Sequence, residues 1–419
     1  MTSRSLFLDV RPLRTSPAFR RLWIGTLLSG LGSQVSSFAL LYYVWTISHN
    51  AALLGLVGLA QLVPLVVFSL IGGHLADRID RRRLVLLTRC GQVVAAAAMA
   101  AVVISGTHQL VILFALIVVQ GALNSLGAPA SRAFIPRLLG DELVAAGYAL
   151  NNIGMQVLLL GSPVLAGLAI AAWGVDGCFV LDAATFFAAI YGVFGLPAMP
   201  PEPNADGKDD RSVIGGLRLV FRTPILIGAF LADLNATVLA MPVAMFPVIN
   251  SEKFGGSPAT LGLFLPALAL GGVLVGTLSG RITRSRRPGI LMLIGGFVWA
   301  VALASFAAIN VFWVAIPFLA IAGAADSVSV IARGTIVQRV TPDAYRGRVN
   351  AVDFVVGAGG PQLGNIRAGL VAAVTSGSES MILGGIAAAI GAVVLTIANP
   401  STRRFRLDAS LDAADPPAA

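Results

Sequence analysis

Four acidic residues lie inside long apolar runs of the sequence: Asp182, Asp233, Asp326 and Asp353. A carboxylate is costly in hydrocarbon, so an acid within a run of membrane length is a functional candidate by default. Away from water such a group favours its neutral form and can exchange a proton near neutral pH. The chemistry that these residues indicate is therefore proton transfer, or the binding of a cationic group.

Asp233 is the candidate nearest the middle of a run. It lies nine residues beyond Pro224, where the run begins, which is about 14 Å along a helix. That depth is close to the midplane of a hydrocarbon core about 30 Å thick. Asn235 and Thr237 follow and make the local face polar. Two interpretations stay open: Asp233 carries a proton or contacts a substrate, or it is a buried acid hydrogen-bonded to a neighbouring helix.

The other three acids have simpler structural explanations. Asp326 has serines beside it and is expected in the inner leaflet, where pairing with a loop arginine is favoured over a coupling role. Asp182 lies near the outer end of its run, where a structural role is expected. Asp353 is close to the start of its run, where a helix N-terminus stabilises an acid without any function.

Arg367 is the basic residue that lies deepest inside a run. It either extends toward the membrane surface or faces a cleft and binds an anionic substrate or a carboxylate. Uncharged polar residues also interrupt the runs, and most of them are expected to hold helices together while a few line a cavity. The candidates for the cavity are Asn235, Gln34, Asn124 and Gln156.

The elements that must position these residues are membrane-spanning helices. Hydrophobic residues make up 57% of the 419 residues and charged residues only 12%, far from the composition of a soluble domain. About 20 apolar residues span a bilayer. Twelve such runs follow one another: Leu22–Ile47, Leu53–Leu75, Leu84–Ser105, Leu110–Ala130, Leu143–Ala172, Gly177–Leu196, Pro224–Ile249, Thr260–Ile282, Gly289–Ala308, Val311–Ala332, Val349–Val374 and Met381–Ala398.

The runs divide into two halves. Prolines and charges between residues 198 and 222 indicate a linker, so we expect a six-helix bundle at 1–197, a second at 223–402 and a tail at 403–419. The halves echo each other in a Gly-Pro pair that bends a helix and allows close packing. These bend residues are Gly161 and Pro163 in the fifth run and Gly360 and Pro361 in the eleventh. Six-span halves in parallel, with a site between them, are typical of transporters.

Lysine and arginine placement predicts the orientation. The amino-terminal segment, the even-numbered loops and the tail are rich in arginine, whereas the odd-numbered loops carry only Lys253. The positive-inside rule therefore places both termini in the cytoplasm of a multi-pass plasma-membrane protein. The net charge of +9 then reflects loops at an anionic leaflet rather than nucleic-acid binding. No cleavable signal peptide and no disulfide between Cys90 and Cys178 are expected.

Half of the residues in the stretch 72–83 are charged, and the stretch follows the second run. It resembles the signature loop of the major facilitator superfamily, matched by Gly73, Asp77, Arg78, Arg81 and Arg82, with Asp80 in place of the usual glycine. The resemblance implies an all-α fold of twelve transmembrane helices in two pseudo-symmetric bundles. It also implies that Asp77 contacts the start of the eleventh span in the outward-facing state.

Further stretches, among them 15–20 and 287–293, are similar to the branch that holds enterobactin exporters and macrolide-efflux proteins. This resemblance implies proton-driven export of an amphipathic small molecule, with a siderophore or a drug as candidates. The partially matched Gly-Ser-Pro of the fifth run resembles the antiporter motif and favours export.

Two other functions stay open, an importer on the same fold and a non-transporting membrane sensor or scaffold. An acid near the midplane favours transport. An enzyme is not expected, because no Ser/His/Asp set, nucleotide-binding loop or metal-ligand spacing occurs. The expected partners are a small-molecule substrate, protons and membrane lipids, for a monomer that needs no cofactor, metal or nucleic acid.

Overall fold

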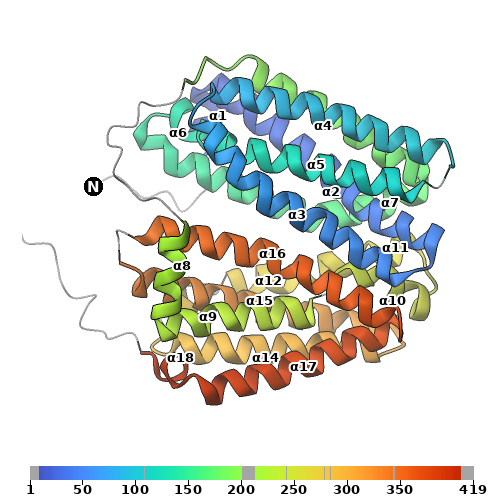
Figure 1. Ribbon diagram of the computed structural model, residues 1–419, viewed down its shortest axis with the longest axis vertical. Coiled ribbons are helices and arrows are strands. Elements are labelled where there is room, and N and C mark those ends of the chain that lie inside the picture. Colours follow the sequence, from blue (N-terminus) through green and yellow to red (C-terminus); the bar gives the residue numbers. More distant parts are fainter. Residues whose placement is uncertain are drawn as a thin grey trace, which may run out of the picture. The chain divides into compact units, whose positions relative to one another are not determined.

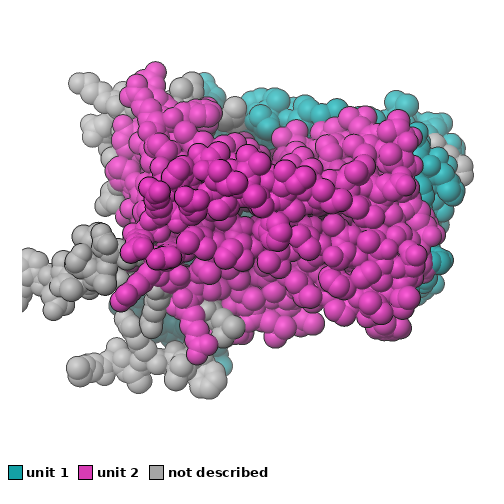
Figure 2. All heavy atoms as spheres, turned by 90° about the horizontal axis from the view of Figure 1, so that it is seen from below, with its two compact units in different colours: residues 1–207, 255–266 teal, residues 208–254, 267–419 magenta. Residues whose placement is uncertain are grey.

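The part of the chain that the structure describes consists of helices and connecting segments, without a strand. The structure is a computed structural model. It describes residues 9–107, 109–200, 213–241, 243–277, 279–283, 285–342 and 345–406. The chain divides into two compact units, coloured separately in Figure 2: unit 1 holds residues 1–207 and 255–266, and unit 2 holds residues 208–254 and 267–419.

Unit 1 is a bundle of long helices with three short ones (Figure 1). Its helices are α1 (Arg11–Thr15), α2 (Pro17–Ser48), α3 (Ala51–Ala76), α4 (Arg81–Ile104), α5 (Leu110–Arg132), α6 (Phe134–Leu138), α7 (Asp141–Phe194) and α11 (Pro258–Leu261). Local sequence explains where they start: the side chains of Ser16, Asn50 and Asp80 accept hydrogen bonds from amides in the first turns of α2, α3 and α4. Such caps satisfy donors that the helix leaves free.

Helix α7 contains the fifth and sixth predicted spans. Its backbone leaves the helical conformation at Gly174, where φ is 73°. An L-residue with a side chain rarely adopts that conformation, so glycine permits the break. The break lies between the two predicted runs.

Unit 2 is also a helical bundle, and one of its helices is broken. Its helices are α8 (Val213–Arg222), α9 (Pro224–Leu234), η1 (Asn235–Ala240), η2 (Val243–Met245), α10 (Phe246–Lys253), α12 (Phe264–Gly276, which starts in unit 1), α13 (Ser279–Thr283), α14 (Pro288–Ala308), α15 (Phe312–Val340), α16 (Arg346–Ala372), α17 (Gly377–Ala398) and α18 (Pro400–Arg404). The seventh predicted span thus becomes α9, a π-helix (η1), a 3₁₀ turn (η2) and α10. π-helical segments occur mostly at functional sites.

Ten helical stretches of the described chain are long and apolar enough to cross a membrane. One of them, Glu142–Phe194, is 53 residues long and contains the break at Gly174. Helix α16 is not among the ten; it carries the charged residues Arg346, Arg348, Asp353 and Arg367. The all-α membrane fold is confirmed, whereas the count of twelve spans stays a prediction.

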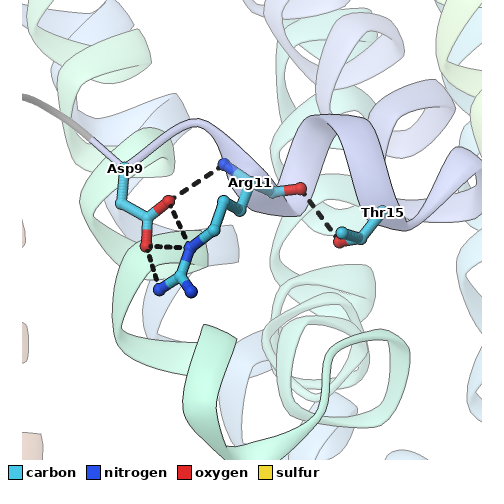
Figure 3. A network of polar contacts seen from close by, with 3 residues as sticks. All are labelled: Asp9, Arg11 and Thr15. Carbon is cyan, nitrogen blue, oxygen red and sulfur yellow. Dashed lines mark hydrogen bonds and ion pairs between the residues drawn. The ribbon is translucent and has the colours of Figure 1, made fainter.

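The start of the described chain is held by a local ion pair (Figure 3). The carboxylate of Asp9 lies 2.7 Å from the Arg11 guanidinium and also accepts the Arg11 amide at 3.0 Å. The Thr15 hydroxyl donates to the Arg11 carbonyl at 2.9 Å. Hydrogen bonding to Arg11 lowers the pKa of Asp9 below its ordinary value. The pair is exposed to water, so its energetic weight is small.

Candidate functional site

The acids of unit 2 converge on one arginine that the sequence prediction assigned to a loop. Arg333 lies inside α15 rather than after it, and its side chain is 10% exposed. Its Nη1 atom is 3.3 Å from Oδ2 of Asp233 and 2.5 Å from Oδ1 of Asp353. One guanidinium nitrogen is therefore shared by carboxylates from α9 and α16.

The two carboxylates hold Arg333 differently. Asp353 accepts an aligned hydrogen bond and is 39% exposed. Asp233 is 11% exposed, and its buried Oδ2 has no aligned hydrogen-bond donor. The 3.3 Å contact is thus an electrostatic pairing rather than a hydrogen bond, since alignment matters as much as distance. Asp233 is the less satisfied of the two acids.

A third acid belongs to the same electrostatic group. Asp326 precedes Arg333 by seven residues on α15, which places both on one face of the helix. It interacts electrostatically with Asp233 and with Arg333. Among the described residues Asp326 forms no ion pair with a loop arginine, and the carboxylates within ion-pair distance of Arg333 are those of Asp233 and Asp353. We call Asp233, Asp326, Arg333 and Asp353 the acid–arginine cluster.

Asp353 differs from its expected setting. It is the eighth residue of α16, which begins at Arg346. The field of a helix N-terminus falls off within the first turn, so the helix end is too far away to stabilise this carboxylate. Arg333 does so instead.

The polar neighbours of Asp233 bind the backbone rather than its carboxylate. Asn235 Nδ2 donates to the carbonyl of Ala388 in α17 at 2.8 Å, and Thr237 Oγ1 donates to the carbonyl of Asp233 at 2.8 Å. In this structure Asn235 holds two helices together. Neither side chain hydrogen-bonds the Asp233 carboxylate.

Arg367 binds backbone carbonyls rather than a carboxylate of the described chain. Its guanidinium donates to the carbonyls of Val238 (3.3 Å), Leu239 (2.5 Å) and Ser380 (3.0 Å). Two of these belong to the π-helix, whose altered hydrogen-bond pattern leaves carbonyls that need another donor. Gly384 makes room, because a Cβ there would lie 2.6 Å from Nη2 of Arg367. Arg367 therefore stabilises the broken helix.

The helix-bend residues differ between the units. In α7, Gly161 has no neighbour where a Cβ would be, and Pro163 is buried with its carbonyl close to Gly262 of unit 1. In α16, a Cβ on Gly360 would lie 2.4 Å from Oγ1 of Thr237, so this turn, which also contains Pro361, packs directly on the π-helix.

The uncharged candidates of unit 1 lie on three helices. Gln34 (α2), Asn124 (α5) and Gln156 (α7) are all exposed within unit 1. Asn124 lines a cavity of about 250 Å³ between α2, α4, α5, α6 and α7. Arg89 lines the same cavity. Sequence analysis did not single out Arg89, which is the ninth residue of α4.

The signature loop joins α3 to α4. Asp77 and Arg78 are exposed, with the Asp77 amide hydrogen-bonded to the Gly73 carbonyl at 3.3 Å. Arg81 donates to the Ala76 carbonyl at 3.4 Å, and Arg82 donates to the carbonyl of Phe194. These contacts leave the Asp77 carboxylate outside the local hydrogen-bond pattern.

Asp80, the residue that replaces the usual glycine, has two bonds of its own. One oxygen accepts the Arg83 amide at 2.9 Å, and the other accepts the Met199 amide at 2.7 Å. The Arg81 amide in turn donates to the Met199 carbonyl at 3.0 Å. The aspartate thus fixes the loop to the segment that follows α7, which glycine would not do.

Comparison with known proteins identifies the family to which this chain belongs. The transmembrane secretion effector family, MFS_3, matches residues 9–417. The chain belongs to this family. The enterobactin exporter EntS of Shigella boydii serotype 4 (strain Sb227) is 27% identical over 408 residues, 97% of each chain. The predicted resemblance to the major facilitator superfamily is confirmed.

Solved structures with the same fold are also transporters. The nucleoside transporter NupG matches with a TM-score of 0.74 at 14% identity, over 93% of this chain and 100% of that one. A bacterial homologue of the human lysosomal transporter Spinster matches with a TM-score of 0.75 at 14% identity, over 96% and 100%. This secretion effector is accordingly a multi-pass inner-membrane transporter of the major facilitator type, and not an enzyme.

Sequence analysis did not single out two of the helical arginines. Arg333 lies one residue beyond the predicted run Val311–Ala332, whereas Arg89 lies six residues into the run Leu84–Ser105, among the arginines that follow the signature loop. Spacing would have revealed them: Arg333 follows Asp326 by seven residues, and Arg89 precedes Gln92 by three, so each pair shares a helix face.

Proposed function

We propose that this secretion effector is a proton-coupled exporter that moves an amphipathic small molecule, a siderophore or a drug-like compound, by alternating access. The observation that carries the proposal is the acid–arginine cluster, in which Arg333 is shared by Asp233 and Asp353. We assign the protein to the plasma membrane as a monomer, with both termini cytoplasmic because the basic residues concentrate in the loops on that side.

The relatives support the direction of transport and the substrate. A protein named as an enterobactin exporter aligns with this chain over 97% of both lengths, so the similarity is not confined to the gating loop. Export of a siderophore is the function that we carry over to this chain. The solved structures share the fold and add no argument about the substrate.

Asp233 is the residue to which we assign the transported proton. Its Oδ2 atom is buried and lacks an aligned donor, so adding a proton there breaks no hydrogen bond. Once Asp233 is neutral, Arg333 is held by Asp353, which is already its closer partner at 2.5 Å. Asp326 is the second proton site, because it lies on the face of α15 that carries Arg333.

This exchange gives the helices two states. When Asp233 is ionised, Arg333 links α9 to both α15 and α16; when it is neutral, the link to α9 is lost. Because α9 ends where the π-helix begins, the lost link frees the most irregular segment of unit 2 to move. Exposed Asp77 is the residue that we assign to the gate on the signature loop.

The test is transport into proteoliposomes with an imposed pH gradient. Asp233→Asn fixes the neutral form, so we expect substrate exchange without a gradient to persist and uphill accumulation to be lost. Asp182→Asn is the matched control: this acid is also buried, but it is bonded to Ser33 and Ser36 of α2, and it should keep accumulation. Uphill accumulation by Asp233→Asn with normal pH dependence would contradict the proposal.

A further inference from the structure

We propose that the cavity around Arg89 in unit 1 binds the anionic oxygen group of the transported molecule, a carboxylate or an acidic phenol carried on an aromatic body. The inference rests on the proposed export function and names the charge that the exported molecule presents. It concerns unit 1 alone, because every residue that lines this cavity belongs to that unit.

Arg89 is an unusual residue for its position. It lies in the third turn of α4, about 12 Å from the start of the helix. Among the described residues, no carboxylate lies within ion-pair distance of it, and no acidic residue lines the cavity. A charge within a membrane helix is costly unless it is compensated. A bound anion would compensate the charge of Arg89.

A purely structural role does not explain Arg89. Other arginines of unit 1 connect different segments: Arg21 donates to the Gly195 carbonyl at 3.0 Å, and Arg137 donates to the Pro200 carbonyl at 2.8 Å. Arg89 donates to Oε1 of Gln92, one turn further along its own helix, at 2.9 Å. This hydrogen bond lies within α4 and does not join that helix to another segment. It orients the guanidinium at the wall of the cavity.

A second observation points to the same ligand. The indole Nε1–H of Trp23, which also lines the cavity, is buried and has no acceptor. A buried donor without a partner costs free energy that a bound acceptor would recover. A guanidinium and an unpartnered indole N–H on one cavity both require oxygen acceptors, and a carboxylate or phenolate supplies them.

The rest of the lining limits the ligand further. Phe19, Trp23 and Tyr148 contribute aromatic surface, and Asn124 and Asn151 contribute amides that can donate or accept. A volume of about 250 Å³ admits one or two fused rings rather than a whole siderophore-sized molecule. The cavity therefore fits one acidic aromatic arm of the molecule. The same chemistry would hold the phosphate of an anionic lipid, which the test must separate.

The experiment measures binding to the purified full-length protein in a neutral detergent, without any gradient. The probes are 3-hydroxy-2-naphthoate and its neutral amide, followed by isothermal titration calorimetry. We expect the wild type to bind the acid about 10- to 100-fold more tightly than the amide, the range for hydrogen bonds to a charged group. Arg89→Gln should abolish this preference, and Trp23→Phe should weaken acid binding several-fold.

Arg83→Gln is the matched control, because it removes the same charge from an exposed position of the same helix. It should keep the preference for the acid. If Arg89→Gln does not fold, Arg89→Lys replaces it; that variant keeps the charge but loses the planar pair of donors, so acid binding should fall several-fold. Equal binding of acid and amide by the wild type overturns the proposal, as does an unchanged preference in a folded Arg89 variant.

Phosphatidylglycerol and phosphatidylcholine, added in separate titrations, distinguish the two sources of the anion. If phosphatidylglycerol alone displaces the naphthoate, the site belongs to a lipid headgroup, and the assignment to the exported molecule is overturned. Binding is measured here without transport. Failure of the proton-coupled export proposal would therefore leave this binding result unchanged, and the two proposals can fail independently.

Discussion

Arg89 in unit 1 and Arg333 in unit 2 are both helical arginines within the bundles, yet their surroundings are opposite. Arg333 has two carboxylates within 3.3 Å and a third acid on its own helix face. Arg89 has a glutamine for a partner and lies at a cavity without any acidic lining residue. The cluster in unit 2 has more acid than base, which suits a group that gains and loses protons. The cavity in unit 1 has base without acid, which suits an anion from outside.

Arg367 shows a third possibility. It has no carboxylate within ion-pair distance in the described chain, but three backbone carbonyls satisfy its guanidinium. The three arginines teach that a charge in a membrane helix is not by itself evidence of a site. Its partners decide: titratable groups indicate coupling, fixed carbonyls indicate structure, and the absence of a partner beside a cavity indicates a ligand.

Replacing Arg333 should have the largest effect on stability. Arg333→Leu leaves Asp233 and Asp353 without their cation, and removing one partner of a buried ion pair typically costs about 3–5 kcal/mol. The measurement is thermal or chemical unfolding in detergent. The double variant with Asp233→Asn should recover part of the loss, since it removes the less satisfied carboxylate. An Arg333→Leu protein as stable as the wild type would show that the cluster is not coupled.

Replacing Arg367 should cost somewhat less. Arg367→Met keeps most of the apolar volume but leaves the carbonyls of Val238, Leu239 and Ser380 without this donor. Each unsatisfied buried group costs about 1–3 kcal/mol, and relaxation recovers part of the sum, so we expect a loss of about 2–4 kcal/mol in the same assay. Substrate binding should survive in the folded fraction. Wild-type stability together with lost binding would instead make Arg367 a binding residue.

Replacing Arg89 should have little effect on stability, and this sharpens the contrast between the units. Arg89→Leu removes a desolvated charge that has no ion-pair partner, at the cost of one hydrogen bond to Gln92. These changes oppose each other, so unfolding should shift by no more than about 1 kcal/mol in either direction. A loss as large as that of Arg333→Leu would mean that Arg89 is structural.

The exposed pair of Asp9 and Arg11 sets the lower limit of the comparison (Figure 3). The pKa of Asp9 is lowered in the folded protein. The contribution of the pair to folding stability is therefore present above the ordinary aspartate pKa of about 3.9 and is lost as the pH falls through the pKa of folded Asp9. Water screens the pair. Asp9→Asn should therefore leave the melting temperature at pH 7 almost unchanged, and a shift of several degrees would contradict this.

Much of the fold could be predicted because membrane helices are specified locally. The predicted run Gly289–Ala308 corresponds to α14 at Pro288–Ala308, and Leu110–Ala130 corresponds to α5 at Leu110–Arg132. Hydropathy determines such ends, since a helix must bury about 20 apolar residues in lipid. It does not detect the π-helix at Asn235–Ala240, whose carbonyls are satisfied by distant side chains such as Arg367.

The candidate site could be predicted only in part. Asp233 stood out because an acid deep in an apolar run is detectable one helix at a time. Its pairing with Arg333, a hundred residues later, depends on how α9, α15 and α16 pack, which no local pattern encodes. Asn235 and Thr237 show the converse, since polar neighbours in sequence point to the backbone rather than to the carboxylate. The cavity at Arg89 is formed by residues from five helices, so it too depends on packing that no local pattern encodes.

The central claim is that Asp233 carries the proton that is exchanged for the substrate. The most direct measurement is proton release on substrate binding, followed with a pH indicator in weakly buffered detergent solution. The wild type should release protons when substrate binds, Asp182→Asn should release as many, and Asp233→Asn should bind substrate and release none. Wild-type proton release from Asp233→Asn would contradict the account and assign the proton to another group of the cluster.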